Sequence, residues 1–410
     1  MVRDHKDSDI TQPSLLSRPC LVVGNFCHDV LIRDGVVVGE TLGGAASFIS
    51  AVLEGLSVPY SLVSKVGPDF AYMSGRSPVV IPTSRTTLFH AHFDSEADGN
   101  GHGDRVLKRV SACDPIQPSD LPQTSFAFGM AVGVGGEVSP ETLEQMLEIC
   151  SVVFVDIQAL IRDFDGVDGT VRLLELRESG FFRLLPRIGF LKASEDEAMF
   201  MDLEEVRKWC CVVLTHGKDG CTVYWKDGEL EISPFAANQV DPTGAGDSFL
   251  GGFAAGLVHG LAVPDAALVG NLFGSLTVGQ IGLPMFDSRL LQRVKDEVQR
   301  RKMQCVSGNE RHDDERMFSK PAGHEQFHAS LGAAKLIPTC MVQECQWDLP
   351  SSPSRAVEQA ILNSIHEENI NCVDGAITAM HLTANEGLQE DGDLLIQFTP
   401  ILGLFSLQKQ

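Results

Sequence analysis

The sequence lacks a long uninterrupted apolar run and an apolar leader segment. Its first 19 residues, MVRDHKDSDITQPSLLSRP, are charged and polar, so neither secretion nor a membrane anchor is expected. Basic residues are scarce as well, because 32 Lys and Arg stand against 55 Asp and Glu, a net charge of −23. Nucleic acids and anionic membranes attract clusters of basic residues. We therefore expect a cytoplasmic protein that binds neither nucleic acid nor membrane.

Paired cysteines at disulfide or metal-ligand spacing are missing too. The 11 cysteines are scattered, and the adjacent Cys210 and Cys211 cannot easily form an unstrained disulfide with each other. Cys340 and Cys345 have no second Cys or His pair at zinc-ligand spacing, so we expect reduced thiols and no zinc site. Because the overall charge repels anions, an anionic ligand would need local helix N-termini, backbone N–H groups and a metal ion.

Short apolar runs rich in β-branched residues alternate with helical patterns along most of the chain. Hydrophobic residues make up 43% of the 410 residues, enough for a sizeable core. Near-continuous apolar runs are typical of strands covered on both faces. The alternation predicts an α/β fold with a mostly parallel central sheet and helices on both faces. The predicted strands lie within 20–25, 61–67, 126–136, 151–158, 187–194 and 210–217. The predicted helices lie within 45–56, 139–150, 169–179 and 195–208.

The chain has one stretch that breaks this alternation and one clear change of character. Between residues 79 and 111 two strand-like runs follow each other without a helix, which predicts an edge hairpin or a small β lid over a site. The last helical pattern ends near Lys302. We therefore expect a flexible segment 1–18, a domain 19–302 and a poorly ordered extension 303–410. The extension is expected to be dispensable for catalysis, because every motif precedes it.

The strongest chemical signal is the string VDPTGAGDSFLGG, in which residues 243–247 open a helix. Glycines at a helix start let the backbone approach an anion, and the N–H groups of the first turn point at it. Asp247 is then either an acid that stabilises the helix dipole or a catalytic base. As a base it would accept the proton of a substrate hydroxyl, which attacks a phosphoryl group held over Gly244, Ala245 and Gly246.

This string resembles the DTxGAGD signature of the ribokinase-like (pfkB) carbohydrate kinases, and other stretches resemble that family in the same order over about 19–302. The resemblance implies a ribokinase-like fold, a small β lid with strands within about 35–40 and 79–111, and ATP and Mg²⁺ as cosubstrate and cofactor. It places a small-molecule substrate at three residues, Asp29, Gly43 and Gly44. It places ATP at Thr215, Gly217, Gly220, Thr243, Gly244 and Asn271.

Two positions depart from the family pattern. The stretch LKASEDEA resembles the family's Asn-x-x-Glu metal motif, with Glu197 acting on Mg²⁺ through water. Ser194 stands at the Asn position of that motif. Phe48 stands where many sugar kinases have an Asn that binds ring hydroxyls, which argues against ribose or fructose. Asp156 and Arg162 are placed near the nucleotide.

Several stretches resemble the sequences of one branch of the family. LGGAASFIS and PRIGFLKAS, among others, resemble the plant myo-inositol kinases most closely. The resemblance implies phosphorylation of myo-inositol at the 3-position, an early step toward phytate. The residues alone support only a kinase of a small hydroxyl compound. A kinase for another sugar or a nucleoside, and a noncatalytic relative that serves as a binding or scaffold protein, stay open. A homodimer through the lid also stays open, because exposed strands are templates for pairing.

Overall fold

The computed structural model describes residues 19–93, 106–307 and 318–336. The predictions for 1–18 and for 337–410 lie outside these described residues. The centre of the described unit is an eight-stranded sheet in the order β16-β15-β14-β13-β10-β9-β1-β4. All pairs from β4 to β14 are parallel, and β15 and β16 add an antiparallel edge. The strands are β1 Cys20–Val23, β4 Tyr60–Val63, β9 Phe126–Ala131, β10 Cys150–Asp156, β13 Phe190–Ser194, β14 Cys211–Thr215, β15 Cys221–Trp225 and β16 Gly228–Ile232. The predicted mostly parallel sheet is confirmed.

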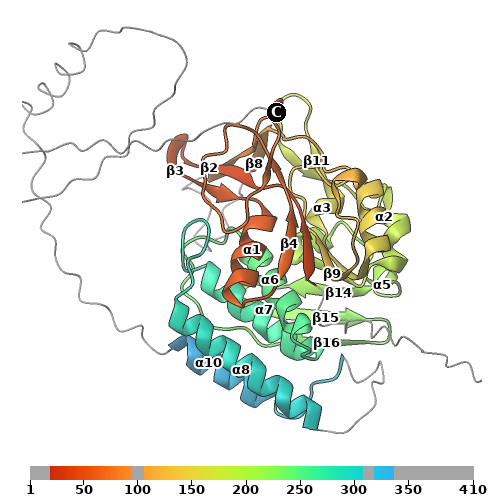
Figure 1. Ribbon diagram of the computed structural model, residues 1–410, viewed down its shortest axis with the longest axis vertical. Coiled ribbons are helices and arrows are strands. Elements are labelled where there is room, and N and C mark those ends of the chain that lie inside the picture. The colour runs from red at the N-terminus through yellow and green to blue at the C-terminus, as the bar shows by residue number, and fades with distance from the viewer. Residues whose placement is uncertain (1–18, 94–105, 308–317, 337–410) are drawn as a thin grey trace, which may run out of the picture. The chain divides into compact units, whose positions relative to one another are not determined.

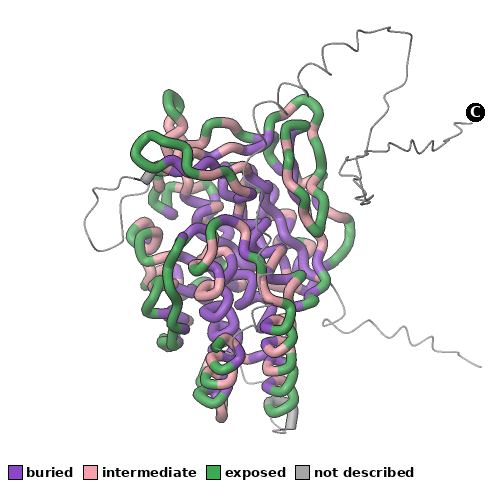
Figure 2. The backbone as a smooth tube through the Cα atoms, turned by 90° about the vertical axis from the view of Figure 1, so that its left-hand side faces the viewer, coloured by how far each residue is buried: buried purple, intermediate pink, exposed green. Residues whose placement is uncertain are grey.

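Successive residues of the parallel strands point into two separate hydrophobic cores. In β1, Cys20 and Val22 belong to one core, whereas Leu21 and Val23 belong to the other. Strand side chains alternate between the two faces, so a strand covered on both sides needs a near-continuous apolar run. Figure 1 shows α1, α6 and α7 on one face of the sheet and α2 on the other. Figure 2 shows the buried residues concentrated in the interior. These helices are α1 Ala45–Gly55, α2 Pro140–Ile149, α6 Ala245–Val258 and α7 Val263–Thr277.

Glycines bring α6 and α7 into close contact. A Cβ at Gly252 would lie 2.8 Å from the carbonyl oxygen of Val269, and a Cβ at Gly256 would lie 2.8 Å from the Cα of Ala266. The two helices can therefore pack backbone against backbone only because these positions carry no side chain. This packing fixes α6, whose first turn carries the TGAGD string.

A second sheet of four strands, in the order β3-β2-β7-β8, forms the lid. Its strands are β2 Cys27–Arg33, β3 Val36–Gly43, β7 Thr87–Phe93 and β8 Val106–Ser111. The small β lid is confirmed, but it contains β2, which the sequence did not predict as a strand. Val79 and Val80 fall outside it, because they form β6 and pair with β5, Lys65–Val66.

Two predicted helices are wrong. Within 169–179 the chain forms β12 Val171–Leu173, which pairs with β11 Arg162–Phe164, followed by a 3₁₀ turn at Leu176–Glu178. Gly169 explains the difference, because it has a φ of 73° and a Cβ there would overlap the backbone of a lid residue, Arg109. The predicted helix 195–208 is instead two short helices, α4 Glu195–Ala198 and α5 Leu203–Val206.

The compact unit extends past the boundary predicted near residue 303. Helix α8 spans Ser288–Ser307, and α10, His324–Leu336, packs against α7 and α8. Phe327 and Leu331 of α10 are buried in the same core as α6 and α7. Among the helices that the structure describes, none combines the length and apolar character needed to cross a bilayer.

Candidate active site

The first turn of α6 has a conformation that requires glycine. Gly244, its N-cap, is left-handed with φ 75° and ψ 0°, and a Cβ there would overlap the ring of Phe48. The N–H of Thr243 donates to Asp241 Oδ1 at 2.9 Å, and the N–H of Ala245 donates to the carbonyl of Pro242 at 3.2 Å. The next N–H groups of the turn belong to Gly246 and Asp247. This is the helix-start geometry expected for binding an anion.

Asp247 is held in place from the neighbouring strand–helix connection. Its Oδ1 accepts a hydrogen bond of 3.1 Å from Gln158 Nε2, and Gln158 opens α3, Gln158–Ile161, directly after β10. Burial raises the pKa of Asp247 above its ordinary range, while the charges of Lys192 and Arg162 and the bond from Gln158 oppose that rise. A carboxylate with a raised pKa and a fixed orientation is suited to general-base chemistry.

Lys192 is a site residue that the sequence reasoning missed. It lies on β13 with a nearly buried side chain, and its Nζ donates to Asp156 Oδ2 at 3.1 Å and lies 3.9 Å from Glu197 Oε2. A Cβ on Gly246 would lie 2.9 Å from the same Nζ. Burial works to lower the pKa of Lys192, but the charges of Asp156, Glu197 and Asp247 outweigh it and raise the pKa above its ordinary value. A permanent ammonium group therefore stands beside the α6 turn.

Glu197 and Ser194 form a capping box at the start of α4. The N–H and the Oγ of Ser194 donate to Glu197 Oε2 at 2.8 and 3.0 Å, and the N–H of Glu197 donates back to Ser194 Oγ at 3.3 Å. Serine and asparagine are both good N-caps, so Ser194 keeps the local geometry at a position where the family motif has Asn. Burial works to raise the pKa of Glu197, but Lys192, the Ser194 bonds and Arg162 hold it below its usual range.

The two residues placed near the nucleotide belong to the same cluster. Asp156 is fully buried at the end of β10, and burial raises its pKa although Lys192 opposes the rise. Arg162 begins β11, donates to the carbonyl of Val134 at 3.3 Å, and acts through its charge on Asp247 and Glu197. Two cations and three carboxylates thus meet at the N-terminus of α6.

The predicted substrate residues connect to this turn through α1. Asp29 is buried on β2, opposite Thr41 of β3, and its carboxylate occupies the space that a Cβ on Gly43 would need. Gly44 is the N-cap of α1 with a φ of 87°, so the di-glycine pair turns the chain from the lid into α1. One turn further on, α1 places Phe48 against Gly244. Phe48 is therefore part of the packing beneath the α6 turn.

Two of the predicted nucleotide residues, Gly220 and Asn271, lie against the end of β16, and Thr215 and Gly217 lie on the neighbouring β14 and its turn. Thr215 ends β14 and its Oγ1 donates to the carbonyl of Ala193 at 3.2 Å. Gly220 has a φ of 94°, and a Cβ there would overlap the carbonyl oxygen of Ile232. Asn271 Nδ2 donates to the carbonyls of Ile232 and Ser233 at 3.2 and 3.0 Å. Asn271 thus holds the backbone after β16. Gly217, with a φ of 56°, opens the short turn Gly217–Asp219 between β14 and β15.

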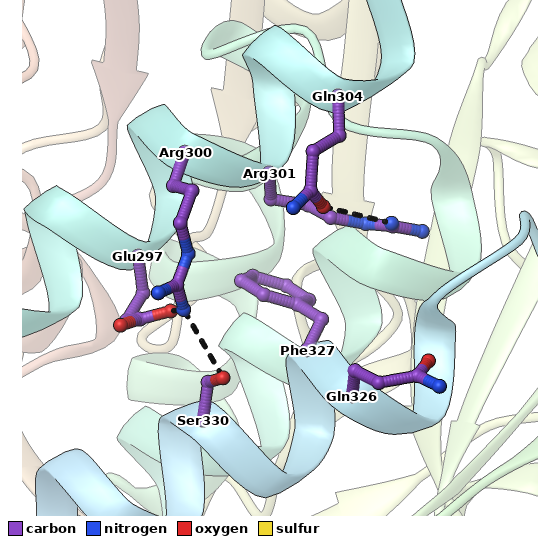
Figure 3. A pocket seen from close by; sticks show the side chains of 7 residues that line it. All are labelled: Glu297, Arg300, Arg301, Gln304, Gln326, Phe327 and Ser330. Carbon is purple, nitrogen blue, oxygen red and sulfur yellow. Dashed lines mark hydrogen bonds and ion pairs between the residues drawn. The ribbon is translucent and has the colours of Figure 1, made fainter.

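A cavity of about 240 Å³ lies elsewhere, between α8 and α10. Figure 3 shows the side chains of both helices around it. Its lining contains none of the predicted site residues and consists of Glu297, Arg300, Arg301, Gln304, Gln326, Phe327 and Ser330.

Comparisons with known proteins relate this chain to known kinases. A family model described as pfkB family carbohydrate kinase matches residues 180–284. The inositol 3-kinase of Arabidopsis thaliana is 61% identical over 330 residues, which cover 80% of this chain and 90% of that protein. The inositol 3-kinase of Oryza sativa subsp. japonica is 51% identical over 330 residues, 77% of this chain and 82% of that protein. A solved pyrophosphate-dependent kinase of the ribokinase family has a TM-score of 0.55 at 20% identity and covers 65% of this chain and 97% of that chain, which shows a shared fold.

Proposed function

The chain belongs to the pfkB family of carbohydrate kinases, and from this premise we propose that it transfers the γ-phosphoryl group of ATP to a hydroxyl of myo-inositol, giving myo-inositol 3-phosphate. The high identity to two inositol 3-kinases over most of their length supports the substrate and the product. The observation that carries the chemistry is the charged cluster around the N-terminus of α6, where Asp247 and Lys192 flank the glycine turn. A noncatalytic relative would not need to keep such a cluster.

Asp247 acts as the general base in this proposal. Its carboxylate accepts the proton of the attacking hydroxyl, so that the oxygen attacks the γ-phosphorus as the bond to the leaving ADP oxygen breaks. The bond from Gln158 orients the carboxylate. The raised pKa of Asp247 makes it a stronger proton acceptor than an exposed carboxylate.

The glycine turn and Lys192 bind the transferring phosphoryl group. The N–H groups of Gly246 and Asp247 and the positive end of α6 attract its oxygens. Lys192 Nζ lies beside Gly246, where a fixed ammonium group would stabilise the charge that spreads over the phosphoryl oxygens in the transition state. Asp156 and Glu197 hold this ammonium group in position.

Mg²⁺ fits the donor set of this site when it is shared with ATP. Among the described residues no three His, Cys, Asp or Glu side chains are grouped to hold a metal alone. Mg²⁺ commonly uses one or two carboxylates, retained waters and substrate phosphates, and Glu197 supplies such a carboxylate at the edge of the cluster. When bound, the ion neutralises charge on the ATP phosphates.

The remaining residues are assigned to substrate binding or to ATP binding. Asp29, Gly43 and Gly44, where the lid meets α1, bind the hydroxyls of the substrate. ATP is bound by Thr215, Gly217, Gly220 and Asn271, on β14, the β14–β15 turn and α7, and by Thr243 and Gly244 at the start of α6. Asn271 acts there through the backbone of Ile232 and Ser233, which its amide holds.

Cellular setting and assembly are further parts of the proposal. The seven cysteines between residues 20 and 221 are free and buried, which supports a reducing compartment such as the cytoplasm. The lid strand β3 lies at a sheet edge and exposes Val36, which is 65% accessible, together with Val37 and Val38. An exposed apolar edge supports pairing with a second copy of the chain through the lid, which light scattering of the purified protein would test.

A coupled ADP-release assay across substrates tests the proposed reaction. We expect kcat/KM for myo-inositol to exceed that for ribose, fructose and adenosine, and the phosphate to appear at position 3 by NMR. Comparable kcat/KM for fructose and myo-inositol would contradict the substrate assignment. No turnover of any of the four compounds would favour the noncatalytic alternative.

A further inference from the structure

Helix α10 holds the segment 233–237, which follows β16. Lys335 Nζ donates to the carbonyl of Ala236 at 2.6 Å, to Ser275 Oγ at 2.8 Å and to the carbonyl of Ser275 at 3.4 Å. His328 Nε2 lies 3.0 Å from the carbonyl oxygen of Pro234, and its ring packs on Phe235 with centroids 4.6 Å apart. Three consecutive residues of the segment therefore contact a helix that lies outside the predicted domain 19–302.

The same segment borders the proposed ATP site. Its start is fixed by Asn271 of α7, and a Cβ on Gly220 would lie 3.1 Å from the nitrogen of Pro234. Residues 238–241 follow this segment, and the N–H groups of Val240 and Asp241 donate to the carbonyl of Val278 at 2.7 and 3.1 Å. Asp241 in turn accepts the hydrogen bond from the N–H of Thr243. Residues 233–241 thus join the proposed nucleotide residues to the first turn of α6.

Lys335 is itself held firmly. Arg293 of α8 donates through Nε and Nη2 to the carbonyl of Ala334, the preceding residue, at 3.2 and 3.1 Å. At the other end of α10, His324 Nδ1 lies 2.7 Å from Asp265 Oδ1, and Arg301 Nε donates to Asp265 Oδ2 at 2.6 Å. Both ends of α10 are thus bonded to the packed helices α7 and α8. These bonds fix the position of the Lys335 ammonium group next to the segment.

We propose that Lys335 is a positioning residue for nucleotide binding, which ties segment 233–237 to α7 at Ser275 and so sets the wall of the ATP site. Ser275 lies one helical turn after Asn271 on α7, so Lys335 and Asn271 fix the same segment from neighbouring points. This inference rests on the proposed function, which identifies the residues around this segment as the ATP site. It assigns to a C-terminal helix a part in ATP binding that the motifs before residue 302 do not reveal.

The test compares Lys335→Met with Lys335→Arg in the full-length protein. The methionine keeps an unbranched side chain and removes the donors, whereas arginine keeps a charged donor at the same point. We expect Lys335→Met to raise KM and Kd for ATP at least about tenfold, the loss expected for hydrogen bonds from a charged group. KM for myo-inositol should stay within about twofold. Lys335→Arg should recover most of the ATP affinity.

Lys320→Met is the matched control. Lys320 also lies in the C-terminal region, but it pairs with Glu325 on the surface at 3.5 Å, so its loss should leave ATP affinity unchanged. If Lys335→Met folds poorly, Ser275→Ala removes one anchor from the other side and should weaken ATP binding in the same direction.

Kd for ATP, measured by calorimetry, separates this inference from the proposed function. A wild-type protein that binds ATP but phosphorylates no polyol would contradict the proposed reaction and leave the Lys335 measurement valid. Unchanged ATP affinity in both Lys335→Met and Ser275→Ala would overturn the positioning role. An equal loss of ATP and myo-inositol affinity in Lys335→Met would overturn it as well, because that result indicates general loosening of the fold.

Discussion

Replacing Lys192 with methionine should affect stability and catalysis by separate routes. Lys192 and Asp156 form a buried pair 3.1 Å apart, with side chains 7% and 0% exposed. Removing one member of such a pair leaves an uncompensated buried charge and costs roughly 3–5 kcal/mol. A change of 1 kcal/mol shifts the melting temperature of a unit of roughly 300 residues by about 1.5–2 °C. We therefore expect Lys192→Met to lower Tm by roughly 5–10 °C.

The catalytic effect should be larger than this instability explains. Lys192 Nζ lies beside Gly246 in the turn that binds the phosphoryl group. Loss of a fixed electrostatic donor to a transition state typically costs about 10²–10³ in kcat. We expect a fall of that size in ADP release, measured at a temperature at which circular dichroism shows that the variant is folded.

A second substitution separates the two routes. In the double variant Lys192→Met with Asp156→Asn, the carboxylate that pairs most closely with Lys192 is gone and Arg162 still acts on Glu197 and Asp247, so Tm should recover by several degrees. Turnover should stay low, because the ammonium group is still missing, and Asp156→Asn alone serves as the control. If kcat recovers together with Tm, Lys192 is only a counter-ion of Asp156, and the reasoning about the phosphoryl group is refuted.

Three further predictions concern pH, glycine and the C-terminal region. Burial raises the pKa of Asp247, and a general base must be ionised to act. The midpoint of the fall in kcat with decreasing pH should therefore lie above the ordinary Asp pKa of about 3.9. Full activity at pH 4 would contradict this. Gly244→Ala should lower Tm and kcat more than Gly246→Ala, because a Cβ on Gly244 would overlap the Phe48 ring at a left-handed φ, whereas a Cβ on Gly246 would lie 2.9 Å from Lys192 Nζ. Equal effects would count against this packing. Ending the chain after Lys302 removes the buried side chains of Phe327 and Leu331, so we expect no soluble, active protein. Ending the chain after Leu336 should retain activity. Wild-type turnover of the chain that ends at Lys302 would support the expectation that residues 303–410 are dispensable.

The central sheet could be predicted because its strands carry their own signal. β1, β10 and β14 are near-continuous apolar runs, as buried parallel strands require. The lid strand β2 carries His28, Asp29 and Arg33 among its seven residues, so its pattern alone does not distinguish it from a loop. The residues of β12 were predicted as a helix from their local pattern. Local propensity does not record tertiary contacts such as the close approach of Gly169 to the lid.

The glycine turn at the start of α6 could also be predicted from local sequence, because its glycines, the helix start and Asp247 are adjacent in the chain. Lys192 could not, because a lysine in the middle of a short strand gives no sign that it is buried against a distant glycine. Asn271 stays a predicted ATP residue, and its side chain donates to the backbone carbonyls of Ile232 and Ser233. The contribution of α10 depends on contacts across some 60 to 100 residues of sequence, such as Lys335 with Ser275 and Ala236.

The most direct test of the central claim is the turnover of Asp247→Asn with saturating ATP and myo-inositol. Asparagine keeps the size of the side chain and can still accept a hydrogen bond from Gln158, but it cannot take up the hydroxyl proton. The account predicts that kcat falls at least about a hundredfold, while ATP affinity and Tm remain close to wild type. If Asp247 only stabilises the helix dipole, the change should cost about 1 kcal/mol or less of stability and leave turnover intact. Near-normal kcat in a folded Asp247→Asn protein would contradict the account.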